Sequence, residues 1–141
     1  YPHLVKSFHE DKFSYDKFSR KYKWLVLISY GCMALGVFIF SDFGAKIFVG
    51  AEFNQVAINI RIMSLVIFFG GLNYYYGILG LVALNYKKDF SKYVLITGLV
   101  SIVSMIIFSI LFNDIGASIV SVMSELFLLI LIVNRLRKIK V

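Results

Sequence analysis

The fold is decided by residues 62–84, which read IMSLVIFFGGLNYYYGILGLVAL. These twenty-three residues include no Asp, Glu, Lys or Arg. As an α-helix the stretch would be about 34 Å long, slightly more than the roughly 30 Å hydrocarbon core of a bilayer. A soluble domain of this size has no core large enough to bury a helix that is apolar on every side. The stretch therefore predicts a membrane-spanning helix.

The composition of the whole chain also points to lipid as the solvent. Of its 141 residues, 60% are hydrophobic and 16% are charged, and the mean hydropathy is +0.82. Charged residues make up about a quarter of a typical soluble domain. A single Cys leaves no basis for a disulfide framework or a thiolate metal site. That residue, Cys32, lies in an apolar segment, so we expect a packed and unreactive thiol.

Hydropathy predicts an all-α integral membrane protein with four transmembrane helices in a bundle. Residues 1–23 are polar and basic with interspersed aromatics, which is typical of an amphipathic segment at the membrane surface. Residues 134–141 form a basic tail. Gly50 is expected to end a short interfacial helix by adopting a left-handed conformation. The four spans are expected near residues 24–40, 56–84, 93–112 and 115–133, with the interfacial helix at 41–55.

The placement of Lys and Arg predicts the orientation of the chain. Thirteen of the fifteen basic residues fall in residues 1–23, in the connection 85–92 or in the tail 134–141. With four spans, these three regions lie on one side of the membrane. The positive-inside rule makes that side cytoplasmic. We therefore expect both ends of this chain to be cytoplasmic, with Lys46 and Arg61 toward the other side.

Glu125 is the ionisable residue predicted to lie deepest in the membrane. It falls near the middle of the fourth span, where an ionised carboxylate costs a few kcal/mol, about 2.5–3.5 on insertion scales. Ser121 is four residues earlier and shares its helical face. Glu125 and Ser121 could form a site that couples transport to H⁺ or Na⁺. Alternatively, they could form an interhelical hydrogen bond that only fixes packing.

Arg61 enters the second span close to its outer end. It is a candidate for contacting an anionic substrate, and it could equally reach the headgroups or pair with Glu52. Later in the same span, Gly70 and Gly71 could permit a bend of the kind found in discontinuous transporter helices. The three tyrosines at residues 74–76 point about 100° apart, so most of them should serve packing or hydrogen bonding.

The sequence gives no sign of an enzyme or of a nucleic-acid-binding protein. It contains no nucleophile elbow, HExxH helix, Walker loop or Gly-rich dinucleotide turn. We therefore expect no catalytic residues, no metal ligands and no cofactor. The net charge of +7 is carried by the membrane flanks rather than by a separate basic patch, so we also expect no nucleic-acid partner.

The order of several short motifs resembles the C-terminal end of polysaccharide flippases of the O-antigen transporter type. That family shares a superfamily with multidrug extruders and lipid II flippases. The resemblance covers residues 13–138, and its most specific motifs are F-x-G-x-x-F at 48–53, Arg-Ile at 61–62 and IGASIVSVMSE at 115–125. In order they read RKYKW, IFVGAEF, INIRI, NYKKDFSK, NDIGAS and NRLRK.

This resemblance implies that the chain corresponds to the last four helices of a two-lobed transporter. Family members carry a lipid-pyrophosphate-linked oligosaccharide across the bacterial inner membrane by alternating access. The implied partners are that oligosaccharide, membrane lipids and the remaining helices of the same transporter. The implied role of Arg61 is to hold the anionic substrate, as cationic cavity residues do in the family. Glu125 matches an acid often found at this place in the final helix.

Two other functions are consistent with the sequence. The chain could be a free-standing four-helix efflux protomer with Glu125 as its proton-coupled site. It could also be a non-transporting membrane assembly subunit, in which Glu125 and Arg61 serve packing alone. A start at Tyr1 rather than Met, together with the order of the motifs, favours a piece of a flippase.

Overall fold

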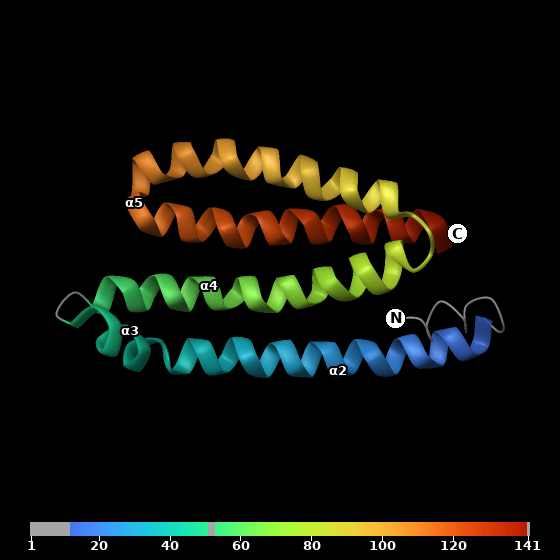
Figure 1. Ribbon diagram of the computed structural model, residues 1–141, viewed down its shortest axis with the longest axis horizontal. Coiled ribbons are helices and arrows are strands. Elements are labelled where there is room, and N and C mark those ends of the chain that lie inside the picture. Colours follow the sequence, from blue (N-terminus) through green and yellow to red (C-terminus); the bar gives the residue numbers. More distant parts are fainter. Residues whose placement is uncertain (1–11, 51–52, 141) are drawn as a thin grey trace.

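The computed structural model describes residues 12–50 and 53–140. Across these residues the chain is helical and has no strand. Three of its helical segments, Tyr22–Ile39, Asn54–Val82 and Lys87–Ile139, are long and apolar enough to cross a membrane. In chain order the elements are α2 (Lys12–Ile39), α3 (Ser41–Val49), α4 (Phe53–Asn73), the π-helix η2 (Tyr74–Val82) and α5 (Lys87–Lys140). Figure 1 shows α2, α4 with η2 as its continuation, and α5 lying side by side, with the short α3 at one end.

The last of these helices, α5, is a hairpin of two arms. Asn113 has φ 53° and ψ −139°, which is not helical, and Figure 1 shows the chain turning back on itself in α5. We call residues 87–112 the first arm and residues 114–140 the second arm. With the segments formed by α2 and by α4 with η2, the two arms make four membrane-length helical segments. The predicted all-α membrane fold is thereby confirmed.

The helices extend beyond the apolar stretches from which they were predicted. Helix α2 already begins at Lys12, within the expected surface segment, and α5 continues through the basic tail to Lys140. Hydropathy marks the part of a helix that lies in hydrocarbon, while backbone hydrogen bonding carries the same helix on into the interface. The short helix α3 is followed by Gly50 at φ 71° and ψ −119°; the positive φ favours glycine, as the sequence indicates, but the ψ angle lies outside the left-handed helical region.

Helix α4 is the central element of the bundle. It contacts α2 on one side and α5 on the other, and α3 packs against it as well (Figure 1). One apolar cluster joins α2 to η2 through Val26, Tyr75 and Leu79. A second cluster joins η2 to the second arm of α5 through Leu81 and Ile132, both fully buried. The two cores therefore lie on opposite sides of the same helical segment.

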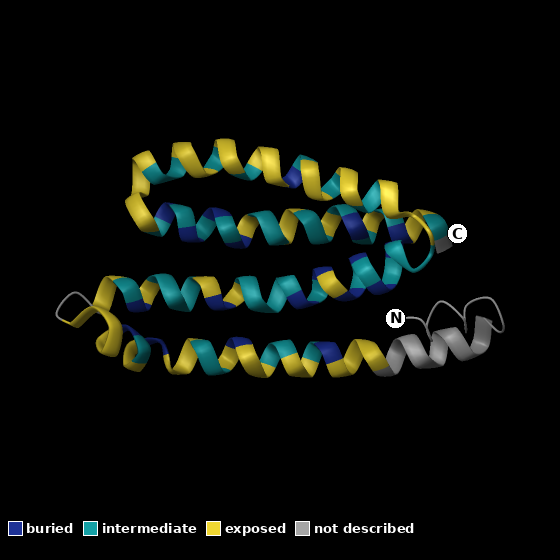
Figure 2. Cartoon of the chain, in the orientation of Figure 1, coloured by how far each residue is buried: buried dark blue, intermediate teal, exposed yellow. Residues whose placement is uncertain are grey.

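The outward faces of α2 and of the first arm of α5 are largely exposed, as Figure 2 shows. These faces carry large apolar side chains, including Leu35, Leu99 and Ile110. In a membrane, such faces suit contact with lipid chains or with further helices. Cys32 lies on an exposed part of α2. The expectation of a packed thiol is wrong at this position, because its apolar neighbours face outward rather than into the bundle.

The two adjacent glycines of α4 have different environments. A Cβ on Gly71 would lie 2.3 Å from Cγ of Tyr30 on α2, while a Cβ on Gly70 would have no atom within 4 Å. Gly71 therefore allows α2 and α4 to approach closely. The departure from α-helical geometry comes further on, in η2, where Gly77 faces the ring of Phe90 in the same close manner.

Candidate functional site

Glu125 lies on the second arm of α5 and is bound by Asn73, the last residue of α4. The Asn73 side-chain amide Nδ2 donates to Oε2 of Glu125 at 2.6 Å and to the Glu125 backbone oxygen at 2.9 Å. Asn73 is buried, with 6% of its surface exposed. In a membrane interior a carboxylate needs such a donor, because no bulk water is available to replace it. The structure thus brings the deepest acid into contact with an amide of a neighbouring helix.

Asn73 was missed as a site residue by sequence reasoning. It is the sole amide side chain in residues 62–84, which is a usable signal because an amide at membrane depth requires a partner. Its acceptor atom Oδ1 is buried and has no hydrogen-bond partner among the described residues. The hydroxyl of Thr97, on the first arm of α5, is buried and unpaired in the same way.

The serines near Glu125 bond to their own helix. Ser121 Oγ donates to the backbone oxygen of Ala117 at 2.9 Å, and Ser124 Oγ donates to that of Ser121 at 2.8 Å. Back-bonding of this kind satisfies a hydroxyl without a second helix. Ser121 therefore shares a face with Glu125 without a hydrogen bond to its carboxylate among the described interactions.

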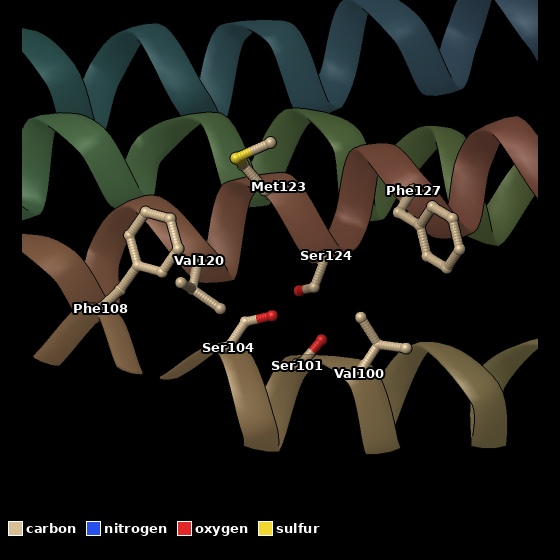
Figure 3. Close-up of a pocket in the computed structure, with 8 residues that line it drawn as sticks. All are labelled: Val100, Ser101, Ser104, Phe108, Val120, Met123, Ser124 and Phe127. Atoms are coloured by element: carbon tan, nitrogen blue, oxygen red, sulfur yellow. The ribbon is translucent and has the colours of Figure 1, made fainter. Parts of the chain in front are cut away.

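A cavity of about 250 Å³ separates the two arms of α5. Figure 3 shows Ser101 and Ser104 of the first arm and Ser124 of the second arm directing hydroxyls into it, between otherwise apolar walls. The walls are formed by Val100, Phe108, Val120, Met123 and Phe127. Glu125 is not among the lining residues, so the cavity and the acid are separate features.

Arg61 is tied to the start of α3. Its Nη2 forms an ion pair and hydrogen bond with Oδ2 of Asp42, and its Nε donates to Ser41 Oγ at 3.0 Å. The guanidinium also lies 6.0 Å from the ring centroid of Phe38 on α2. Its side chain remains 41% exposed. The alternative partner Glu52 lies outside the described residues.

A network of polar side chains joins α4 to the bend of α5 at the same end of the molecule. Asp114 accepts hydrogen bonds from Gln55 Nε2 at 3.0 Å and from Asn59 Nδ2 at 2.7 Å. Ser118 Oγ donates in turn to Asn59 Oδ1 at 3.1 Å. These contacts connect the start of α4 to the beginning of the second arm of α5.

The opposite end of the bundle has its own ion pair. Arg135 Nε donates to Asp89 Oδ2 at 2.8 Å, which ties the beginning of the first arm to the end of the second. The same guanidinium lies 5.4 Å from the ring centroid of Tyr86. The described residues contain no group of three or more His, Cys, Asp or Glu able to hold a metal ion. The described residues thus offer one carboxylate predicted to lie at membrane depth and three polar connections near the bundle ends.

These features define the class of the protein as an all-α integral membrane protein with paired polar groups inside the bilayer. Over 95 residues the chain is 32% identical to "Putative O-antigen transporter" of Escherichia coli (strain K12). The match takes in 67% of this chain and 23% of that relative. It confirms the resemblance to O-antigen transporters seen in the motifs.

The chain thus spans about a quarter of the length of the curated relative that it matches. No family model matches it, and no solved structure matches it significantly. The resemblance therefore covers a part of a transporter, and it assigns no site residue.

Proposed function

We propose that this chain is part of a flippase that carries a lipid-linked oligosaccharide, an O-antigen or capsule repeat unit, across the bacterial inner membrane by alternating access. The observation that carries the proposal is the similarity to a protein named as an O-antigen transporter over two thirds of the chain. The four membrane-length segments support it, because translocation of a polar glycan requires a membrane-embedded protein path.

The proposed direction follows from charge. Lys87, Lys88 and Lys92 are exposed near the start of α5, and Arg137 and Lys138 are exposed at its end. Figure 1 places both of these regions at the same end of the bundle. The positive-inside rule makes that end cytoplasmic, where the lipid-linked precursor would be taken up.

Glu125 is proposed to couple this movement to H⁺ or Na⁺. A carboxylate at membrane depth can exist in a charged and a neutral form, and Asn73 can donate to either form. Alternation between the two forms changes the electrostatic free energy of the helix pair and can bias one conformation over another.

Arg61 remains a predicted contact for the anionic substrate. Its ion pair with Asp42 uses part of its hydrogen-bonding capacity, while its side chain is still 41% exposed. Arg61→Ala in the full-length protein tests this role. Loss of surface polysaccharide at normal protein level would support substrate contact, and unchanged export would contradict it.

The decisive experiment uses Glu125→Gln in the full-length protein, expressed in a strain that lacks its own transporter. Gln keeps an oxygen that can accept from Asn73 Nδ2 but cannot bind or release a proton at neutral pH. A coupling role predicts a more than tenfold loss of surface polysaccharide at normal protein level. Unchanged polysaccharide would overturn the coupling role. Absence of export by the wild-type protein would overturn the flippase proposal itself.

A further inference from the structure

An apolar groove of about 400 Å³ lies between α2 and α4. Its α2 wall includes Gly31, Leu35 and Phe38, and its α4 wall includes Leu65 and Phe68. Leu35, Phe38 and Leu65 are 61%, 49% and 46% exposed, so the groove opens outward from the helix pair. In a bilayer such an opening faces lipid chains or another helix.

The groove runs along the helix pair, from the end of α2 that adjoins α3 toward its middle. Phe38 is next to Ile39, the last residue of α2, and therefore lies near the surface at which α3 is found. Gly31 is seven residues earlier, about 10 Å deeper along the helix. That length covers most of one leaflet of a roughly 30 Å hydrocarbon core.

A cation lies at the surface end of this groove. The guanidinium of Arg61 is 6.0 Å from the ring centroid of Phe38, which lines the groove. Ser64, another lining residue, donates its hydroxyl to the Arg61 backbone oxygen at 2.7 Å. An apolar groove that ends beside an exposed guanidinium suits a lipid whose acyl chain lies in the groove and whose headgroup lies at the guanidinium.

The charge at this end suits an anionic headgroup. Arg61 uses Nε and Nη2 for Ser41 and Asp42, and a guanidinium has five N–H donors, so further donors remain for a phosphate. Lys46 is exposed and lies four residues after Asp42, on the same face of α3.

We propose that an anionic membrane phospholipid binds between α2 and α4, with an acyl chain in the groove and its phosphate at Arg61. The lipid fills the space between the two helices and adds a second anionic partner for Arg61. This assignment goes beyond the proposed transport function and does not depend on it.

Native mass spectrometry of the purified full-length protein, with added phosphatidylglycerol or phosphatidylcholine, tests the assignment. We expect the wild-type protein to retain phosphatidylglycerol at least fivefold better than phosphatidylcholine. Arg61→Gln should remove most of that preference, and Arg61→Lys should keep part of it. Equal retention of the two lipids by the wild-type protein, or an unchanged preference in Arg61→Gln, would overturn the proposal.

A second variant tests the groove without touching the ion pair. Leu35→Trp places a larger ring in the groove and should reduce retention of phosphatidylglycerol severalfold. Leu99→Trp is the matched control, because Leu99 is 59% exposed, similar to Leu35, and is not a groove residue. Equal retention in the two Trp variants would contradict the proposal. The thermal unfolding temperature of each variant shows that a loss of lipid is not a loss of fold.

A polyprenyl pyrophosphate serves as the competing ligand. If it bound instead of phosphatidylglycerol, and Leu35→Trp abolished its binding, the groove would belong to the transported lipid and the phospholipid proposal would be wrong. Lipid retention is measured without transport, so its failure leaves the flippase proposal intact. Failure of export with normal lipid retention would overturn the flippase proposal and leave the phospholipid proposal intact.

Discussion

The side-chain amide of Asn73 donates both to the carboxylate of Glu125, at 2.6 Å, and to its backbone oxygen, at 2.9 Å. The two residues are 52 positions apart and belong to α4 and to the second arm of α5. The contact therefore joins the central helix of the bundle to the final one at membrane depth, next to the beginning of η2.

Asn73→Leu should lower the free energy of unfolding by about 1–2 kcal/mol, because the Glu125 carboxyl group loses its amide donor in an environment without water. Unfolding of the purified protein in mixed micelles, followed by circular dichroism, measures the change. In a Glu125→Leu background the same substitution should cost at least 1 kcal/mol less. An equal cost in both backgrounds would show that the two side chains are not energetically coupled.

Gly71→Ala should destabilise the protein by about 1–3 kcal/mol, since the added Cβ would meet the Tyr30 side chain at 2.3 Å and force α2 away from α4. Gly70→Ala is the matched control, because nothing lies within 4 Å of its Cβ. The control should be neutral or stabilising by up to about 1 kcal/mol, as expected for Gly→Ala in a helix. Thermal unfolding temperatures in detergent provide the comparison, and similar losses in both variants would refute the packing role of Gly71.

The bend of α5 gives a third prediction. Asn113 has φ 53°, which β-branched residues rarely adopt, so Asn113→Val should cost about 1–3 kcal/mol. Asn113→Gly should be at least as stable as the wild type, because glycine adopts this conformation without a Cβ clash. Protease resistance of the hairpin, measured alongside unfolding, reports on the bend. A Val variant as stable as the Gly variant would be incompatible with this geometry.

The orientation is tested with single cysteines in a Cys32→Ser background, which is needed because Cys32 is exposed and is the one cysteine of the chain. Lys46→Cys on α3 should react with a membrane-impermeant maleimide in intact cells. Lys88→Cys at the start of α5 should react after the membrane is permeabilised. Both residues are exposed, so accessibility within the protein does not separate them. Labelling of Lys88→Cys in intact cells would contradict the proposed orientation.

The general architecture could be predicted from the sequence because it depends on averages over many residues. The number of apolar segments follows from hydropathy, and Gly50 marks the end of a helix through local backbone preference. The helix limits were less predictable. Hydrogen bonding carried α2 and α5 past the residues at which hydropathy falls.

The partners of the site residues could not be predicted in the same way. Glu125 and Arg61 were recognised from depth and charge, but their contacts depend on how each helix is rotated about its axis. Sequence spacing gives Ser121 as the neighbour of Glu125, while the structure gives Asn73 from another helix. For Arg61 the observed partners, Asp42 and Ser41, belong to α3, whose placement against α4 is set by tertiary packing.

The π-helix η2 constrains how this region can change in length. A backbone with i→i+5 hydrogen bonding holds more residues per turn than an α-helix, so η2 stores surplus chain without a loop. Removal of one residue would let the segment relax to α-helical pitch, which absorbs much of the rotation that a deletion causes in an ordinary α-helix. The segments on either side of η2 would keep most of their facing, while Gly77 and Gly80 inside it would shift relative to Phe90 and Leu136. A single-codon deletion in η2 should therefore be less damaging than one in the middle of α4.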